Sequence, residues 1–188
     1  LNKITESGRT TTVKNSYIVD KHKLLKVDEV NNSSILNSTI EQISKNIKKE
    51  KNKIIVCSDF RHGIFNTQTV STFLKAINKS CFKVADSQVA SRWGNITEFQ
   101  NFDLITPNER EGRFALADQD STVGTLSSLL SKKSKCQNLI LKLGSKGIFC
   151  SAKDKKAKSS YFSVDSFANN VVDPVGAGDA LLAYATLS

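Results

Sequence analysis

The stretch Asp173-Pro-Val-Gly-Ala-Gly-Asp179 runs directly into Ala180-Leu-Leu-Ala-Tyr-Ala185, so a glycine-rich turn opens onto an alanine-rich, helix-forming segment. Gly176 and Gly178 let the backbone turn tightly, and successive N–H groups then point outward where the helix begins. Such N–H groups and the positive end of the helix dipole together attract an anion. The stretch therefore predicts an anion hole formed by Gly176, Ala177 and Gly178.

Asp179 places a carboxylate in the first turn of the same helix. A carboxylate there repels a resting phosphate, but it is well placed to accept a proton from an attacking hydroxyl group while the amides hold a phosphoryl group in transfer. Two plainer interpretations compete. Asp179 is a favourable first-turn residue of any helix, and two glycines also begin the dinucleotide-binding G-x-G-x-x-G loop, although Leu181 stands at its third glycine position. No Gly-Lys-Ser/Thr occurs, so a Walker A loop is excluded.

Upstream of this turn, short apolar runs alternate with longer amphipathic runs. The short runs are typical of buried strands and lie at 53–57, 81–85, 102–106 and 139–143. The amphipathic runs are typical of helices and lie at 36–47, 67–78 and 123–130. This alternation predicts an α/β fold with three layers, a mostly parallel sheet covered by helices on both faces.

Turn-forming residues add detail to this plan. β-Forming residues flank the charged break at 20–23, which predicts a strand hairpin within residues 1–28. A second hairpin is expected where residues 147–152 follow the strand at 139–143. Residues 31–34 supply N-cap candidates for the helix at 36–47.

Polar residues stand at the ends of three predicted strands, at Asp59, Asp86 and Asn108. Ligands of parallel sheets bind beyond the carboxyl ends of the strands. We therefore expect these three side chains to border one cleft.

Composition narrows the function. The formal net charge is +9, but the 27 Lys and Arg are scattered along the chain, which argues against a nucleic-acid-binding face and for attraction of anionic small molecules. No apolar run is long enough to span a bilayer. The four cysteines and two histidines have no zinc-binding spacing, and the cysteines are far apart with no C-x-x-C pair, which favours a reducing, cytoplasmic compartment.

The stretch from Asp173 to Asp179 resembles the second signature of the ribokinase-like carbohydrate kinases (the phosphofructokinase B family), usually written D-T-x-G-A-G-D, with Pro174 in place of the usual Thr. The resemblance implies a kinase that uses ATP and Mg²⁺ to phosphorylate a sugar or sugar phosphate. It also implies that Asp179 is the catalytic base and that Gly176, Ala177 and Gly178 form the anion hole.

Two further motifs follow the order of that family. Asn108-Glu-Arg-Glu111 is similar to its N-x-x-E motif, which implies that Asn108 and Glu111 organise Mg²⁺, Glu111 partly through water. The plainer interpretation is a helix capping box. Leu143-Gly-Ser-Lys-Gly147 resembles its L-G-x-x-G turn, which implies that Lys142, Gly144 and Gly147 lie near nucleotide phosphates. The plainer interpretation there is an ordinary hairpin turn.

Within the family, the chain is most similar to the heptose 7-phosphate kinase domain of ADP-heptose synthesis proteins. Four segments follow that domain's order: 9–14, 24–28, 58–63 and 104–108. Arg61, with Asp59 and Asp86, is then a candidate for binding the substrate, although Arg61 is also an ordinary exposed loop residue.

The family's first signature contains a Gly-Gly pair, which this sequence lacks. We therefore expect residues 1–188 to be one partial kinase domain, incomplete at both ends and inactive alone, with a hairpin region at 1–28 and an α/β core at 29–188. The hairpin is a candidate surface for a homodimer. The alternatives are a non-catalytic binding or regulatory protein with this fold and a basic nucleic-acid-binding module. The kinase interpretation requires Asp179 to face an open cleft together with Asn108 and Glu111.

Overall fold

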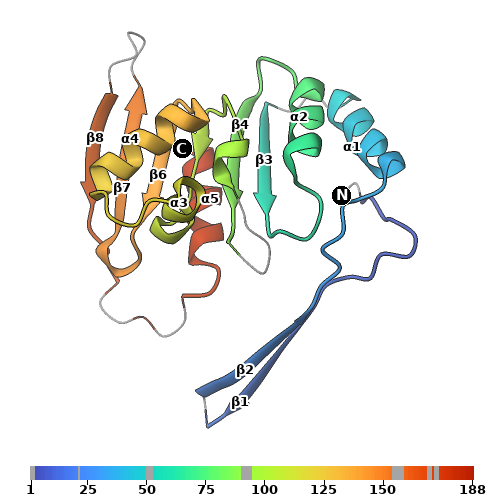
Figure 1. The fold of residues 1–188 in the computed structure, drawn as a ribbon, viewed down its shortest axis with the longest axis horizontal. Helices are drawn as coiled ribbons and strands as arrows, with labels where there is room; N and C mark the ends of the chain where they lie inside the picture. The colour runs from blue at the N-terminus through green and yellow to red at the C-terminus, as the bar shows by residue number, and fades with distance from the viewer. Residues whose placement is uncertain are drawn as a thin grey trace. The chain divides into compact units, whose positions relative to one another are not determined.

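The computed structural model describes residues 3–20, 22–49, 53–89, 95–153, 159–168, 171 and 174–188. These residues form two compact units. The first unit comprises residues 1–50 and 61–77, and the second comprises residues 51–60 and 78–188. Figure 1 labels their helices and strands.

The first unit contains a two-stranded hairpin. Strands β1 (Val13–Val19) and β2 (His22–Glu29) pair antiparallel, with Val13 opposite Glu29. Every residue of both strands is exposed, including the apolar side chains of Tyr17, Ile18 and Leu24. The hairpin therefore forms where the alternating β-forming residues predict it, but it buries neither of its faces within this unit.

Helices α1 (Asn37–Lys49) and α2 (Thr67–Ala76) complete the first unit and pack against each other. The side chain of Asn66 caps α2, and Thr69 Oγ1 accepts a hydrogen bond from the Asn66 N–H group. Phe73 of α2 is buried and meets the ring of Phe65 edge to face. The period of apolar residues thus predicted α2 correctly.

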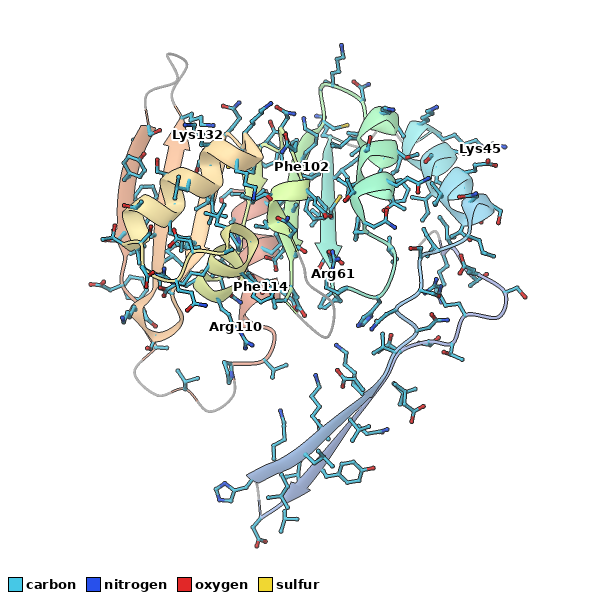
Figure 2. The ribbon with its side chains drawn as sticks, viewed as in Figure 1. Lys45, Arg61, Phe102, Arg110, Phe114 and Lys132 are labelled. Carbon is cyan, nitrogen blue, oxygen red and sulfur yellow. The ribbon has the colours of Figure 1, made fainter. Side chains whose placement is uncertain are left out.

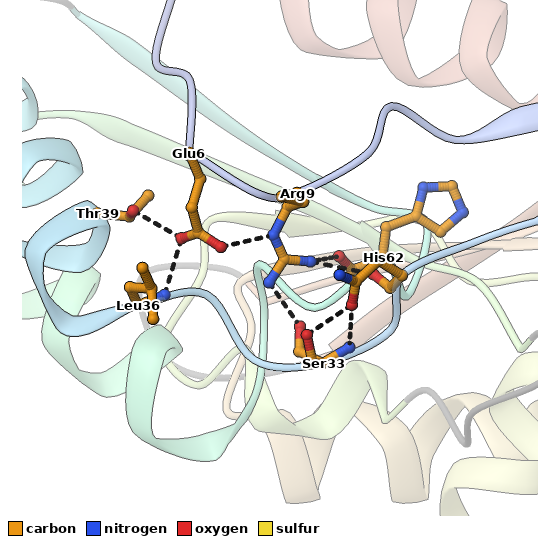
Figure 3. Close-up of polar contacts among 7 residues, drawn as sticks. Glu6, Arg9, Ser33, Leu36, Thr39 and His62 are labelled. Atoms are coloured by element: carbon orange, nitrogen blue, oxygen red, sulfur yellow. Dashed lines mark hydrogen bonds and ion pairs between the residues drawn. The ribbon is translucent and has the colours of Figure 1, made fainter.

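The predicted N-cap of α1 among residues 31–34 was wrong, because α1 begins at Asn37. A tertiary contact replaces the local cap: the carboxylate of Glu6 accepts bonds from Leu36 N at 2.8 Å and from Thr39 Oγ1 at 2.6 Å. Arg9 Nε donates to the same carboxylate at 2.8 Å (Figure 3). Leu36 precedes the helix and is exposed, so it does not contribute to the apolar face.

The second unit is built on a six-stranded sheet in the order β3-β4-β5-β6-β7-β8. Its strands are β3 (Ile54–Asp59), β4 (Phe82–Ser87), β5 (Leu104–Ile105), β6 (Asn138–Lys142), β7 (Ile148–Lys153) and β8 (Ser159–Val164). β3 to β6 run parallel, whereas β7 and β8 are antiparallel to their neighbours. The mostly parallel sheet confirms the predicted α/β class.

Helices cover both faces of this sheet. On one face lie α3 (Glu109–Leu116) and α4 (Val123–Ser134), and a Cβ atom on Gly112 of α3 would be in van der Waals contact with Leu141 Cδ1, at 3.5 Å. On the other face, Leu182 of α5 (Ala177–Leu187) packs with Val84 and Ile140. Ile140 and Leu141 are consecutive on β6, so they point to opposite faces. The three-layer arrangement is therefore confirmed.

Two short 3-10 helices, η1 (Ile96–Glu98) and η2 (Gly144–Lys146), complete the second unit. Within the described part of the chain, no helix has the length and apolar character needed to cross a membrane.

Candidate active site

A cavity of about 660 Å³ opens at the carboxyl end of the parallel strands in the second unit. It brings together predicted site residues from β4, α3, β6, the β6–β7 turn and the start of α5. Those residues are Asp86, Asn108, Glu111, Lys142, Gly144, Gly147, Gly176, Ala177, Gly178 and Asp179. The cavity is thus the cleft that a parallel sheet presents beyond its strand ends.

The best-defined contact in this cavity joins Lys142 to Asp86. Lys142 Nζ lies 3.0 and 3.1 Å from the two carboxylate oxygens of Asp86, whose side chain is 6% exposed. Thr106 Oγ1 donates to the same carboxylate at 3.2 Å. Burial raises the pKa of the Asp86 carboxyl group. The Lys142 ammonium group and the hydrogen bond from Thr106 lower this pKa, and the negative charge of Asp179 raises it. Asp86 and Asp179 are therefore close enough to interact electrostatically.

The sequence predicted Lys142 and Asp86 separately but did not predict their pairing, and it missed Thr106. One signal was available for Thr106, because it is a polar residue at the end of the predicted strand at 102–106. Only the order of the strands shows that β4, β5 and β6 bring these three polar groups together.

The start of α5 has the backbone form that its glycines predict. Gly176 is the N-cap residue with φ +83°, in the left-handed region that glycine adopts without strain. The Ala177 N–H group donates to Pro174 O at 3.2 Å, and the Ala180 N–H group donates to Gly176 O at 2.9 Å. Among the described residues no side chain caps this helix. Within the described part of the chain, the N–H groups of Gly178 and Asp179 therefore remain available in the first turn.

The α5 start lies against the Lys142–Asp86 pair. A Cβ atom on Gly178 would lie 3.4 Å from Lys142 Nζ, so the absence of a side chain there permits the close approach. Asp179 is exposed and lines the same open cavity as Asn108 and Glu111. It is thus not buried behind the sheet. Asp173, the first residue of the motif, lies outside the described residues.

Asn108 and Glu111 form the capping box that the plainer interpretation predicted. Asn108 Oδ1 accepts from Glu111 N at 2.8 Å, and Glu111 Oε2 accepts from Asn108 N at 2.7 Å. Glu111 is buried, which raises the pKa of its carboxyl group, while the bond from Asn108 N–H and the charge of Lys142 lower it. The capping box thus holds a buried carboxylate at the wall of the cavity.

The turn between β6 and β7 forms another wall. The predicted hairpin is confirmed by the antiparallel pairing of the two strands, and Leu143 N donates to Gly147 O at 2.8 Å. Gly147 has φ +85°, and a Cβ atom there would lie only 2.0 Å from Val164 O. Glycine at 147 therefore lets the end of β8 cross closely over the turn.

Comparison with known proteins agrees with this geometry. Residues 5–186 match the pfkB family of carbohydrate kinases. The chain belongs to this family.

Curated relatives of this pfkB-family chain include two proteins called bifunctional protein HldE. That of Aliarcobacter butzleri (strain RM4018) is 26% identical over 193 residues, which cover 97% of this chain and 37% of the relative. That of Campylobacter jejuni subsp. doylei is 26% identical over 183 residues, which cover 95% of this chain and 37% of the relative. The chain therefore spans about 37% of the length of these relatives.

Solved structures share the fold. Ribokinase from Giardia lamblia has a TM-score of 0.66 at 19% identity, covering 94% of this chain and 54% of that one. Phosphofructokinase-2 from Escherichia coli, in complex with substrates and products, has a TM-score of 0.67 at 15% identity, and the match covers 87% of this chain and 53% of that one. The ribokinase-like fold of this pfkB-family chain is thereby confirmed.

Two predicted substrate-binding residues, Asp59 and Arg61, are not among the described residues that line this cavity. Asp59, at the end of β3, is buried and accepts a hydrogen bond from Ser87 Oγ at 2.8 Å. It is not among the described residues that line the cavity. Arg61 belongs to the first unit and has φ +62°. Roles for both in substrate binding stay predictions.

The cavity suits Mg²⁺ only in its hydrated form. Four carboxylates line it, from Asp86, Glu111, Asp165 and Asp179, but no group of three or more His, Cys, Asp or Glu in the described part of the chain is arranged to hold a metal. Mg²⁺ that arrives with nucleotide phosphates needs only one or two carboxylates because it keeps several waters. Asp86 is paired with Lys142 and Glu111 Oε2 is held in the capping box, which favours contact through water.

Proposed function

We propose that the protein containing this chain transfers a phosphoryl group from ATP to a hydroxyl group of a sugar or sugar phosphate. One observation carries the proposal: the Asp179 carboxylate and the available N–H groups of the α5 start face the same cavity as the Lys142–Asp86 pair. The match of residues 5–186 to the pfkB carbohydrate kinases supports it.

In this mechanism, Asp179 accepts the proton of the attacking hydroxyl group. Its carboxylate is exposed to the cavity and is therefore accessible to a substrate. The N–H groups of Gly178 and Asp179 donate to the phosphoryl oxygens, whose negative charge must be stabilised during transfer. Because Ala177 N–H already donates to Pro174 O, its contribution to the predicted anion hole requires that turn bond to open.

Lys142 supplies a positive charge beside this helix start. Its ammonium group is held by Asp86 and lies 3.4 Å from the position that a Cβ atom on Gly178 would take. Mg²⁺ bound with ATP would neutralise phosphate charge, and Glu111, acting through water, and Asp86 are the residues that would hold it. The rigid strand ends keep these groups in place before a ligand binds.

A heptose phosphate is the acceptor that we propose to test first. The support is the similarity to the HldE proteins together with the RTTTVK and SDFRHG segments at 9–14 and 58–63. The formal net charge of +9 favours a phosphorylated acceptor over a neutral sugar because it attracts anions. Asp59 and Arg61 are the proposed acceptor-binding residues. We also expect residues 1–188 alone to be inactive, since they span 37% of the relatives' length.

The test is Asp179→Asn in the longest available form of the protein, assayed for sugar-phosphate-dependent ATP turnover. Loss of the general base should lower turnover by at least about 100-fold, with the circular dichroism spectrum unchanged. Asp120→Asn, at an exposed position on the α3–α4 connection, is the matched control and should keep full turnover. Unchanged turnover in Asp179→Asn removes this residue from the mechanism, and ATP binding without turnover in the parent favours a non-catalytic role.

A homodimer formed through the β1–β2 hairpin is the oligomer that we propose. Two strands alone are marginally stable in water, and this hairpin leaves large apolar side chains exposed on residues that include Tyr17, Ile18 and Leu24. A second copy would cover them. Sedimentation should therefore show a dimer that Ile18→Lys with Leu24→Lys converts to a monomer, and a monomeric parent would refute the proposal.

A cytoplasmic location is proposed from the cysteines. All four, Cys57, Cys81, Cys136 and Cys150, are buried free thiols. Burial raises the pKa of Cys57 to about 12, so this thiol is protonated and unreactive at neutral pH. A reducing compartment suits such thiols.

A further inference from the structure

Thr106 directly follows β5 and is fully buried at the carboxyl end of this strand. Figure 2 shows the direction of the chain here, which runs from Phe102 through β5 toward Arg110 of α3. The Thr106 N–H group donates to Ala85 O at 3.1 Å, which holds its backbone against β4. A hydroxyl group buried so completely is costly unless it forms a hydrogen bond. The Thr106 hydroxyl group donates that bond to Asp86, at 3.2 Å.

Thr106 and Lys142 bind the same oxygen atom of Asp86. Oδ1 accepts from Thr106 Oγ1 at 3.2 Å and from Lys142 Nζ at 3.0 Å. Because β5 lies between β4 and β6, the hydroxyl group comes from the strand between those that carry the carboxylate and the ammonium group. Donors from two strands restrict rotation of the Asp86 side chain more than either donor alone.

The position of the Lys142 ammonium group depends on this carboxylate. A lysine side chain has a flexible four-carbon stem, so its ammonium group can take many positions. Among the described residues, three other carboxylates line the cavity of the proposed phosphoryl-transfer site and could attract it: those of Glu111, Asp165 and Asp179. Pairing with Asp86 instead keeps Lys142 Nζ beside Gly178, at the start of α5.

Burial strengthens this arrangement. The Asp86 side chain is 6% exposed and that of Lys142 is 17% exposed, so water and salt screen their attraction only weakly. Burial raises the pKa of Asp86, whereas the charge of Lys142 and the hydrogen bond from Thr106 lower it. The Thr106 hydroxyl group therefore favours the ionised carboxylate, which is the form that holds an ammonium group.

We propose that Thr106 is a positioning residue of the phosphoryl-transfer site, which holds the ammonium group of Lys142 beside the start of α5 through Asp86. This role rests on the proposed function, because the ammonium group is placed to meet negative charge on the transferring phosphoryl group. Thr106 is not among the described residues that line the cavity, so it acts through Asp86. Without its hydroxyl group, Lys142 moves away from this position, and the transition state is stabilised less while substrate binding changes little.

Steady-state kinetics of Thr106→Val and Thr106→Ser, in the longest available form of the protein, test this role. Valine has the shape of threonine without its hydroxyl group, whereas serine keeps the hydroxyl group. Thr106→Val should lower kcat at least about ten-fold and change the KM for ATP less than about three-fold. Thr106→Ser should restore kcat to near the parent's value.

Thr97→Val is the matched control. Thr97 is buried in the same unit, its hydroxyl group donates to Asn95, and it is not among the described residues that line the cavity. This variant loses a buried hydroxyl group of the same kind and should keep the parent's kcat.

Labelling of Lys142 gives a readout that does not require turnover. Brief treatment with acetic anhydride, followed by mass spectrometry of the peptides, measures how fast each lysine is acetylated. Lys142 should react at least about three-fold faster in Thr106→Val, as expected for the loss of one hydrogen bond. It should react at the parent's rate in Thr106→Ser and Thr97→Val. If Thr106→Val does not fold, Thr106→Cys replaces it and should change kcat and labelling in the same directions, because a thiol is a weaker donor.

In an active parent, an unchanged kcat in Thr106→Val overturns the proposal. A Thr106→Ser variant as slow as Thr106→Val also overturns it, because the loss then comes from packing. Unchanged labelling of Lys142 overturns it whether or not the parent is active. A parent without turnover refutes the kinase proposal instead, and labelling then still decides whether Thr106 holds Lys142.

Discussion

Lys142 Nζ makes a two-pronged contact with Asp86, at 3.0 and 3.1 Å from its carboxylate oxygens, although 56 residues separate the pair in the chain. Asp86 is the next-to-last residue of β4 and Lys142 is the last residue of β6, and these strands lie on either side of β5. The contact therefore connects two strands that do not hydrogen-bond to each other. It also places a fixed ammonium group against Gly178 at the start of α5.

Lys142→Met should destabilise the protein by about 3 kcal/mol, because it leaves the buried Asp86 carboxylate without its cation. Burial already raises the pKa of Asp86, and losing Lys142 raises it further. A carboxyl group whose pKa is higher in the folded state stabilises the fold below its unfolded pKa and loses that contribution as the pH rises. The loss in free energy of unfolding that Lys142→Met causes should thus be larger at pH 8 than at pH 5. Urea unfolding at both pH values measures it.

Asp86→Asn in the Lys142→Met background is the matched control. It removes the unpaired charge and should restore part of the lost stability. A deficit that is equal at both pH values, or that the second substitution does not reduce, would contradict this account of the pair.

A comparison of Gly147→Ala with Gly144→Ala separates two costs in stability, that of a positive φ and that of a steric overlap. Both glycines have positive φ, +85° and +63°. Nothing lies within 4 Å of a Cβ atom at 144, whereas one at 147 would meet Val164 O at 2.0 Å. Gly144→Ala should therefore cost about 1 kcal/mol, and Gly147→Ala more than about 3 kcal/mol. Thermal and urea unfolding compare them, and equal losses would show that β8 shifts to relieve the overlap.

Glu111→Gln separates the structural from the proposed catalytic role of this residue. Glutamine also completes a capping box, so the free energy of unfolding should change by less than about 0.5 kcal/mol. If the carboxylate helps to hold Mg²⁺ through water, the Mg²⁺ concentration for half-maximal turnover should rise. Glu111→Ala is the comparison and should lose about 1 kcal/mol of stability with the cap. An unaltered Mg²⁺ requirement in Glu111→Gln would leave Glu111 as a cap alone.

Glu6 should make the first unit sensitive to acid. Hydrogen bonds from Thr39 and Arg9, then from Leu36 N–H, lower the pKa of Glu6 from 4.5 to about 2. Because the folded pKa is the lower one, Glu6 stabilises the fold above pH 4.5 and loses this contribution as the pH falls toward 2. The stability difference between the parent and Glu6→Gln should be constant above pH 5 and should shrink below it. A difference that is independent of pH from 6 to 3 would show that the carboxylate charge has no role.

Local patterns in the sequence predicted much of the second unit. The alternation of apolar runs indicated the parallel sheet, the L-G-x-x-G residues indicated the β6–β7 turn, and Gly176 indicated the α5 start. These features depend on residues that are neighbours in the chain, because side-chain periodicity and glycine conformations are local properties. The predicted strand at 102–106 was too long, since β5 pairs only at Leu104 and Ile105.

The cap of α1 shows where local patterns fail. Residues 31–34 offered suitable N-cap side chains, but the helix begins at Asn37 because the Glu6 carboxylate binds Leu36 N–H and Thr39 from 30 residues or more away. A cap from a distant segment leaves no signal in the residues next to the helix.

The sequence by itself determined the family, the α/β class and the backbone form of the anion-binding turn, since each follows from residue types in short, contiguous stretches. Only the tertiary structure decided that Lys142 pairs with Asp86 and that Thr106 joins them. The physical reason is that parallel strands joined through helices bring their carboxyl ends together across long separations in the chain.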